Sequence, residues 1–144
     1  MPSPADVVSE IVVRVNYSET DQMGVVYHAR YVVWLDMART EHLRSAGMSY
    51  KDVEAMGVRL AVGELTVRYR QAAHYDDLVR IRCWVRELAS RRILFGYAID
   101  HAETGQLLAT ASTAMFSVSN DHRPIRLPLE VTGLLSVAPD PVRL

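Results

Sequence analysis

The stretch of sequence that most constrains the fold is Tyr17-Ser18-Glu19-Thr20-Asp21-Gln22-Met23-Gly24-Val25-Val26-Tyr27-His28. It follows an alternating run, residues 11–17, and precedes an apolar segment, residues 31–46, that lacks Pro and Gly. Alternation of apolar and polar residues predicts a strand, and a breaker-free segment rich in Leu, Met and Ala predicts a helix. The quoted stretch is therefore predicted to connect a strand to the start of a helix.

Asp21 and His28 lie in this connection, close to the expected helix start. A helix start offers unpaired backbone N–H groups and the positive end of the helix dipole. A carboxylate beside such donors can activate a nucleophile while the donors stabilise a developing oxyanion. The stretch therefore favours acyl-transfer chemistry. The alternative for Asp21 is an Asx turn, a common role of Asp in loops.

The predicted helix over residues 31–46 has an unusual distribution of apolar residues and is followed by Gly47, a typical helix-ending residue. Its first half is apolar on nearly every side, and its second half is polar. A helix that is apolar all round must be enclosed on more than one side. Because a sheet covers only one side, a second covering surface is expected, such as another subunit.

The remaining segments predict a short helix over residues 50–56, capped by Ser49, and then strands over residues 60–70, 78–88, 93–100 and 107–119. Short connections between consecutive strands favour antiparallel pairing. The order predicts an α+β fold in which a five-stranded antiparallel sheet curls around one long central helix. Residues 1–144 are expected to form one domain, with a core over about residues 11–128. The tail, residues 129–144, is expected to begin with a short helix near Pro128 and then to fray.

The composition narrows the class of protein. The chain has 144 residues with a formal net charge of −1, which lacks the basic excess of a nucleic-acid-binding domain. No apolar run reaches the length of a membrane span and no signal-peptide pattern occurs near Met1, so a cytoplasmic protein is expected. Cys83, the only cysteine, falls in the apolar phase of a strand and predicts a buried, inert thiol. The histidines show no metal-ligand spacing, so no metal site is expected.

Three motifs occur in order along the chain. They are Tyr17-x-x-x-Asp21 with Gly24-Val25-Val26-Tyr27-His28-Ala29-x-Tyr31 and Ala38-Arg39-x-Glu41; then Tyr69-Arg70-x-x-Ala73-x-Tyr75-Asp76-Asp77; then Asn120-x-x-x-Pro124-x-x-Leu127-Pro128. Together with the element order, they resemble the hotdog-fold acyl-CoA thioesterases of the 4-hydroxybenzoyl-CoA thioesterase type, including the bacterial members encoded with the Tol–Pal envelope system. The resemblance covers roughly residues 12–128.

The resemblance implies hydrolysis of an acyl-CoA thioester to a free acid and coenzyme A. No metal or separate cofactor is implied, because the coenzyme is part of the substrate. The family's catalytic carboxylate falls on Asp21, either as general base or as nucleophile, and the accompanying Tyr and His fall on Tyr17 and His28. A backbone N–H at about His28 is implied as the group that polarises the thioester carbonyl.

The resemblance also implies a phosphate-binding segment and an assembly. Ser90, Arg91 and Arg92 occupy the predicted connection between the third and fourth strands, where family members bind the coenzyme's phosphates. Family members form homodimers with active sites at the subunit interface, commonly paired into homotetramers. A partner subunit would supply the second covering surface that the helix requires.

Some of these residues have a simpler structural interpretation. Tyr17 lies on the apolar face of the predicted first strand and could be a core residue, while Arg91 and Arg92 could be solvated hairpin charges. Glu41 is a reserve catalytic carboxylate, since some hotdog thioesterases carry theirs on this helix; pairing with Arg44 is the alternative. Among possible cavity walls are Val62, Tyr69, Phe95 and Trp34.

Two other functions remain open at this point. One is a hotdog hydratase or dehydratase acting on the acyl group of an acyl-CoA, although none of its motifs is present. The other is a non-catalytic acyl-CoA-binding protein, since a fold alone does not fix a function. The acyl group itself, whether short aliphatic, long aliphatic or aromatic, is left open by the sequence.

Overall fold

The computed structural model describes residues 7–144. In chain order its elements are β1 (Ser9–Arg14), the 3₁₀ turn η2 (Tyr17–Glu19), α1 (Arg30–Ser45), α2 (Tyr50–Ala55), β2 (Val58–Tyr69), β3 (Leu78–Leu88), β4 (Arg92–His101), β5 (Leu107–Ser119) and α3 (Leu129–Thr132). The predicted strands and helices are therefore confirmed. The main difference is at β1, which ends at Arg14 instead of Tyr17.

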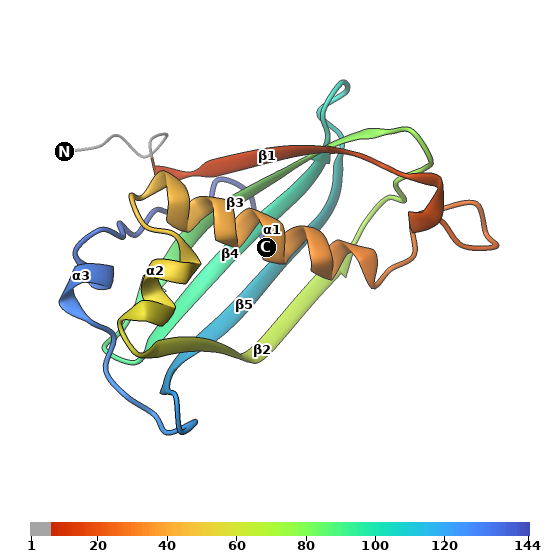
Figure 1. Ribbon diagram of the computed structural model, residues 1–144. Helices are drawn as coiled ribbons and strands as arrows, with labels where there is room; N and C mark the ends of the chain where they lie inside the picture. Colours follow the sequence, from red (N-terminus) through yellow and green to blue (C-terminus); the bar gives the residue numbers. More distant parts are fainter. Residues whose placement is uncertain (1–6) are drawn as a thin grey trace.

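The five strands form one antiparallel sheet in the order β1-β3-β4-β5-β2. Figure 1 shows the long helix α1 lying along one face of this curved sheet, with the short helices α2 and α3 at one end. This arrangement confirms the predicted hotdog fold. The loop between η2 and α1 lies at the other end of the molecule.

The core lies between α1 and the sheet. Alternate residues of β3, from Val79 to Val85, point toward the helix and are completely buried, as the alternation predicted. Trp34 and Leu35 of α1 pack in the same cluster. Burial raises the pKa of the Cys83 thiol, which keeps it protonated and agrees with the predicted inert role.

The sheet leaves one side of α1 open. Val32, Val33 and Met37 of α1 remain exposed at 37%, 39% and 45%. The first half of the helix is thus apolar on a side that no part of residues 7–144 covers. This side is where a second covering surface is expected.

The C-terminal tail is ordered, so the expectation that it frays is wrong. The indole Nε1–H of Trp84 donates to Asp140 Oδ1 at 2.9 Å, and Arg86 forms two hydrogen bonds with the same carboxylate. The N–H of Ala138 donates to the carbonyl of Val85 at 2.9 Å. Trp84 lies on the sheet face opposite α1 and requires both a cover and a hydrogen-bond acceptor. Residues 137–140 supply both.

Within residues 7–144, no helix has the length and apolar character needed to cross a membrane.

Candidate active site

The loop that carries Asp21 is closed by short-range hydrogen bonds. The N–H of Asp21 donates to the carbonyl of Val25 at 2.9 Å, and the N–H of Gly24 donates to the carbonyl of Asp21 at 3.0 Å. Gly24 has a φ of 77°, which glycine adopts without steric cost. The N–H of Met23 donates to Asp21 Oδ1 at 2.9 Å, which is an Asx turn. The interpretation of Asp21 as an Asx-turn residue is therefore correct.

A buried carboxylate, Glu19, fixes this loop to the helix. Glu19 is 5% exposed, and its Oε2 accepts hydrogen bonds from Arg30 and from Trp34 Nε1 at 3.1 Å. Its Oε1 accepts from the N–H of Asn16 at 2.8 Å, and its backbone carbonyl accepts from the N–H of Tyr27. Glu19 thus connects both ends of the loop, at Asn16 and at Tyr27, to α1. The sequence interpretation missed Glu19, because its neighbours Ser18 and Thr20 are polar and give no sign that this acid is buried.

Asp21 and His28 line the same cavity, which has a volume of about 280 Å³. The residues that line it come from the loop, the start of α1 and the end of β2: Asp21, Met23, Val25, Val26, His28, Tyr31, Tyr69, Arg70, Gln71 and Ala72. The cavity thus combines an apolar wall with a carboxylate, an imidazole and a guanidinium.

Two tyrosines form one wall of this cavity. The Tyr69 hydroxyl donates to the carbonyl of His28 at 2.7 Å, and the Tyr31 hydroxyl accepts from the N–H of Ala73 at 3.1 Å. The two rings meet edge to face with their centroids 5.1 Å apart. Desolvation raises the pKa of both hydroxyls, so both stay protonated at neutral pH. Tyr69 was foreseen as a wall residue; Val62, Phe95 and Trp34 do not line this cavity.

The start of α1 provides backbone donors beside the cavity. The N–H of Tyr27 donates to the carbonyl of Glu19 and the N–H of Arg30 donates to the carbonyl of Tyr27. The backbone N–H of His28 and the backbone N–H of Ala29 donate no hydrogen bond to any residue among 7–144. Unpaired donors of this kind are a property of helix starts and can bind an anion.

Tyr17 lies outside the cavity. It belongs to the 3₁₀ turn and is 77% exposed, with its ring edge to face with Tyr75 at 5.6 Å between centroids. The interpretation as a core residue is therefore wrong. The physical reason is that the chain turns at Asn16, where the backbone N–H bonds to Glu19, so the alternation of β1 does not continue to Tyr17.

Ser90, Arg91 and Arg92 are far from Asp21 within one chain. They lie in the β3–β4 connection, at the end of the sheet that carries α2 and α3 (Figure 1). Arg92 forms an ion pair with Glu87 at 2.6 Å, whereas Arg91 is exposed. The structure thus brings Asp21 and His28 together and places the predicted phosphate-binding residues at the opposite end.

Glu41 does not line the cavity either. It forms an ion pair with Arg44 at 3.0 Å and lies in a separate groove between β1 and α1. Pairing with Arg44, the alternative interpretation, is confirmed. In the part of the chain that the structure describes, no cluster of three or more His, Cys, Asp or Glu side chains could hold a metal ion.

In this chain a long helix lies against a curved antiparallel sheet, and a carboxylate and a histidine line one cavity at the start of the helix. Residues 15–138 match the family described as the thioesterase-like superfamily, and the chain belongs to that superfamily.

Individual relatives agree with this assignment. The acyl-CoA thioesterase YbgC of Haemophilus influenzae is 34% identical over 120 residues, which covers 83% of this chain and 88% of the relative. The acyl-CoA thioester hydrolase YbgC of Escherichia coli O6:H1 is 38% identical over 91 residues, covering 63% and 68% of the two chains. The crystal structure of DHNA-CoA thioesterase from Staphylococcus aureus is similar with a TM-score of 0.80 and 34% identity, covering 83% of this chain and 80% of that one.

Proposed function

We propose that this chain hydrolyses an acyl-CoA thioester to a free acid and coenzyme A. The observation that carries the proposal is that the Asp21 carboxylate and His28 line one cavity at the start of α1. The relatives are named acyl-CoA thioesterase, acyl-CoA thioester hydrolase and DHNA-CoA thioesterase, and these names support the same substrate class.

In the proposed reaction, Asp21 either deprotonates the attacking water or attacks the thioester carbonyl itself. In the first route the hydroxide oxygen bonds to the acyl carbon, the carbon–sulfur bond breaks, and the thiolate receives the proton. In the second route a carboxylate oxygen bonds to the acyl carbon and the carbon–sulfur bond breaks, which releases the coenzyme thiolate and leaves a mixed anhydride. Water then hydrolyses the anhydride to the free acid and the Asp21 carboxylate, and the proton released goes to the thiolate. In both routes the unpaired N–H groups near His28 stabilise the negative charge on the carbonyl oxygen.

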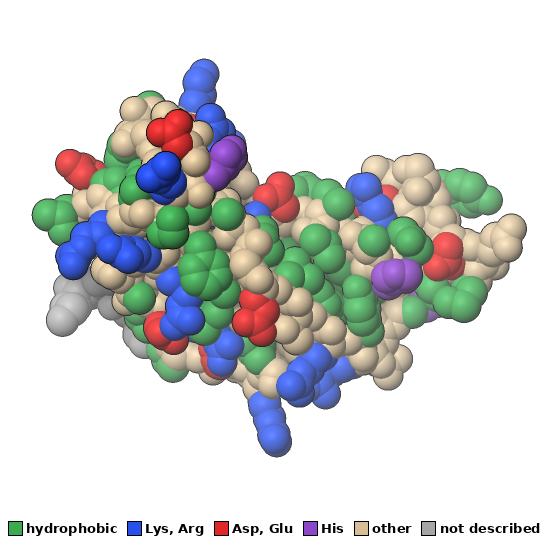
Figure 2. Space-filling view, turned by 90° about the horizontal axis from the view of Figure 1, so that it is seen from below, with side chains coloured by type: hydrophobic (Ala, Val, Ile, Leu, Met, Phe, Trp, Pro, Cys, Tyr) green, Lys and Arg blue, Asp and Glu red, His purple; other side chains and the backbone are tan. Residues whose placement is uncertain are grey.

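We further propose a homodimer formed through the β2 edge. β2 is an outer strand of twelve residues and is exposed along most of its length. Val62, Leu65 and Tyr69 of this strand and Phe116 of its neighbour β5 expose large apolar side chains. Figure 2 shows the molecule from below relative to the view in Figure 1. Hydrophobic side chains gather across this side among scattered charged ones. A long, apolar, unpaired edge is an unfavourable surface for a lone chain.

A two-fold dimer through this edge supports the proposed coenzyme site. β2 runs from Val58, whose partner Ser119 lies beside the β3–β4 connection, to Tyr69 in the Asp21 cavity. Antiparallel pairing of two β2 edges therefore sets the Asp21 cavity of one subunit beside the partner's β3–β4 connection. We propose that Arg91, with Ser90 and Arg92, binds coenzyme phosphates in that arrangement, and that His28, which lines the same cavity, assists Asp21. We also propose that two dimers pair into a tetramer. The proposed location is the cytoplasm, where acyl-CoA pools occur.

A panel of acyl-CoA esters assayed with a thiol-reactive reporter tests the function. The proposal predicts thiol release from at least one short aliphatic, long aliphatic or aromatic ester. An enoyl-CoA in the same panel, followed by loss of its double bond, tests the hydratase alternative. Loss of the double bond without thiol release, or tight binding of all esters without turnover, would contradict hydrolysis.

A further inference from the structure

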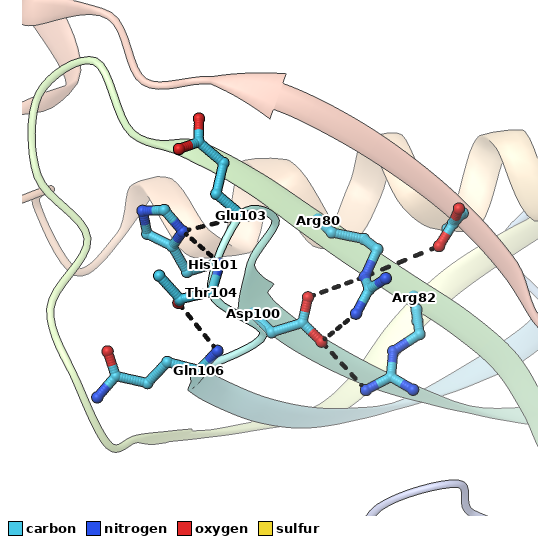
Figure 3. Close-up of polar contacts among 8 residues, drawn as sticks. Arg80, Arg82, Asp100, His101, Glu103, Thr104 and Gln106 are labelled. Carbon is cyan, nitrogen blue, oxygen red and sulfur yellow. Dashed lines mark hydrogen bonds and ion pairs between the residues drawn. The ribbon is translucent and has the colours of Figure 1, made fainter.

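The sheet face turned away from α1 carries an unusual concentration of arginines. Figure 3 shows Arg80 and Arg82 of β3 directed toward Asp100 of β4. Arg80 bonds Asp100 through Nε and Nη2 at 2.9 and 3.1 Å, and Arg82 bonds it through Nη2 at 3.2 Å. Asp100 is 2% exposed, so one buried carboxylate is shared by two guanidinium groups. The carboxylate of Glu10 lies 3.8 Å from Arg80 at the exposed edge.

A second cavity, of about 270 Å³, opens on this same face. Its polar lining consists of the Arg68 and Arg86 guanidinium groups and the hydroxyls of Thr66, Thr110 and Ser112. Arg86 is neutralised by Asp140 and also reaches Ser112 Oγ at 3.4 Å. Arg68 is exposed and forms no ion pair with any residue among 7–144. Ala111 and Leu144 complete the lining, and no acidic side chain belongs to it, so Arg68 is the cationic side chain of this cavity that no carboxylate among residues 7–144 neutralises.

Two buried polar atoms on this sheet face lack hydrogen-bond partners among residues 7–144, and one of them, the Thr110 hydroxyl, lines the cavity. Thr110 is 1% exposed, and its hydroxyl bonds to no residue that the structure describes; the same holds for Arg82 Nε. The strand register places both in one row across the sheet, in the order Arg82, Ala98, Thr110 and Arg68. A buried polar group without a partner costs about 1–3 kcal/mol, so such groups generally have a bound acceptor or water.

We propose that this second cavity binds a phosphate-type oxyanion through the Arg68 guanidinium and the hydroxyls of Thr66, Thr110 and Ser112. Charge and hydrogen-bonding capacity both favour this class: every polar side chain that lines the cavity can donate, and no acidic side chain competes. The volume exceeds the share of about 30 Å³ that one water occupies in the liquid. The site shares no lining residue with the Asp21 cavity and does not depend on the proposed hydrolysis.

Binding of inorganic diphosphate, measured by its effect on thermal unfolding at ionic strength matched with sodium chloride, tests the site. A ligand that binds only the folded state raises the unfolding midpoint in a saturable way. We expect saturation in the millimolar range for the unmodified chain and at least tenfold weaker apparent affinity in Arg68→Gln. Arg59→Gln is the matched control, because Arg59 lies on the same strand, pairs with Glu54 and does not line the cavity.

Thr110→Val tests the buried hydroxyl separately. The substitution keeps the shape and removes the unpartnered group, so stability without anion should stay equal or rise. The response to diphosphate should weaken by several fold. The proposal would be overturned if the unmodified chain showed no saturable response up to about 10 mM diphosphate. It would also be overturned if Arg68→Gln and Thr110→Val responded to diphosphate as Arg59→Gln does.

Kinetics with Arg68→Gln identify the source of the phosphate. A raised KM for an acyl-CoA, with an unchanged KM for the matching acyl-pantetheine, assigns the site to the coenzyme's own phosphates. An unchanged KM for both, together with lost diphosphate binding, assigns it to a separate phosphate compound. Either result keeps the anion site. Absence of any hydrolysis would contradict the proposed function only, because diphosphate binding is measured without substrate.

Discussion

Trp34 Nε1 donates a hydrogen bond of 3.1 Å to the buried carboxylate of Glu19. Through this contact the helix that fills the sheet holds the loop that carries Asp21, two residues beyond Glu19. Arg30 binds the same Glu19 oxygen at 3.2 Å, which compensates the buried charge. The position of the proposed catalytic carboxylate therefore depends on a residue that does not line the cavity.

Glu19→Gln should weaken this attachment. The amide retains one acceptor but directs its NH₂ group toward other donors, so at least one buried donor loses its partner. We expect the free energy of unfolding, measured with urea, to fall by about 1–3 kcal/mol. Turnover in the folded fraction should fall as well. Glu130→Gln, on the exposed side of α3, is the control and should change neither quantity. Equal stability of the two variants would contradict the anchoring role.

Much of the fold could be predicted because its signals are local. The alternation in β3 assigns residues to the two faces of the sheet, and Gly47, with a φ of 105°, ends α1 as expected. The failures came from contacts that the sequence does not display. β1 stops early because Glu19 bonds back to Asn16, and the tail is ordered because Trp84 on the outer face needs Asp140.

The candidate site divides in the same way. Asp21 and His28 were predictable as neighbours because the loop and the helix start are adjacent in sequence. The wall formed by Tyr69, Arg70 and Gln71 depends on where the end of β2 lies, which follows from the strand order of the sheet. The distance to Ser90–Arg92 likewise became clear only with the topology, which places the β3–β4 connection at the far end.

Stability should depend on pH through His42, a buried histidine of α1 whose Nδ1 lies 2.7 Å from Ser9 Oγ. Burial lowers the pKa of His42 below its ordinary value of 6.5. The unfolded chain therefore binds this proton more readily than the folded chain. The free energy of unfolding should fall as the pH drops below about 6.5, by at most about 1.4 kcal/mol per pH unit, until the folded-state pKa is reached.

The contribution of His42 can be separated from that of the other titrating groups. Urea unfolding between pH 7.5 and pH 5 should show a shallower pH dependence in His42→Gln than in the unmodified chain. His122→Asn, in an exposed turn with a φ of 61° that asparagine tolerates, should retain the original dependence. Identical slopes for all three proteins would exclude the assigned role of His42.

Gly96→Ala should destabilise the sheet. An added Cβ would lie 2.6 Å from the indole of Trp84, which is completely buried and bonded to Asp140. Overpacking of this kind costs about 1–3 kcal/mol, measurable as a lower midpoint of urea unfolding. In a Trp84→Leu background the same substitution should cost much less, because the smaller side chain leaves room. Equal costs in both backgrounds would show that the indole is not the cause.

The proposed interface can be tested by adding charge to one sheet edge at a time. Phe116→Glu, at a side chain 41% exposed beside β2, should convert the dimer to a monomer in sedimentation experiments. Val12→Glu on the opposite edge strand, at a side chain 50% exposed, is the matched control and should leave the dimer intact. The opposite pattern would place the interface at β1. Monomer formation should also reduce hydrolysis, since coenzyme binding then lacks the partner's β3–β4 connection.

The central claim is that the Asp21 carboxylate carries the chemistry of thioester hydrolysis. The most direct measurement is the kcat of Asp21→Asn with the best acyl-CoA of the panel, compared with Asp76→Asn, an exposed aspartate that does not line the cavity. The asparagine keeps the hydrogen bond from the N–H of Met23, so the loop should remain folded. We predict a fall in kcat of about 100-fold or more for Asp21→Asn and little change for Asp76→Asn. Near-normal turnover by Asp21→Asn would contradict the account.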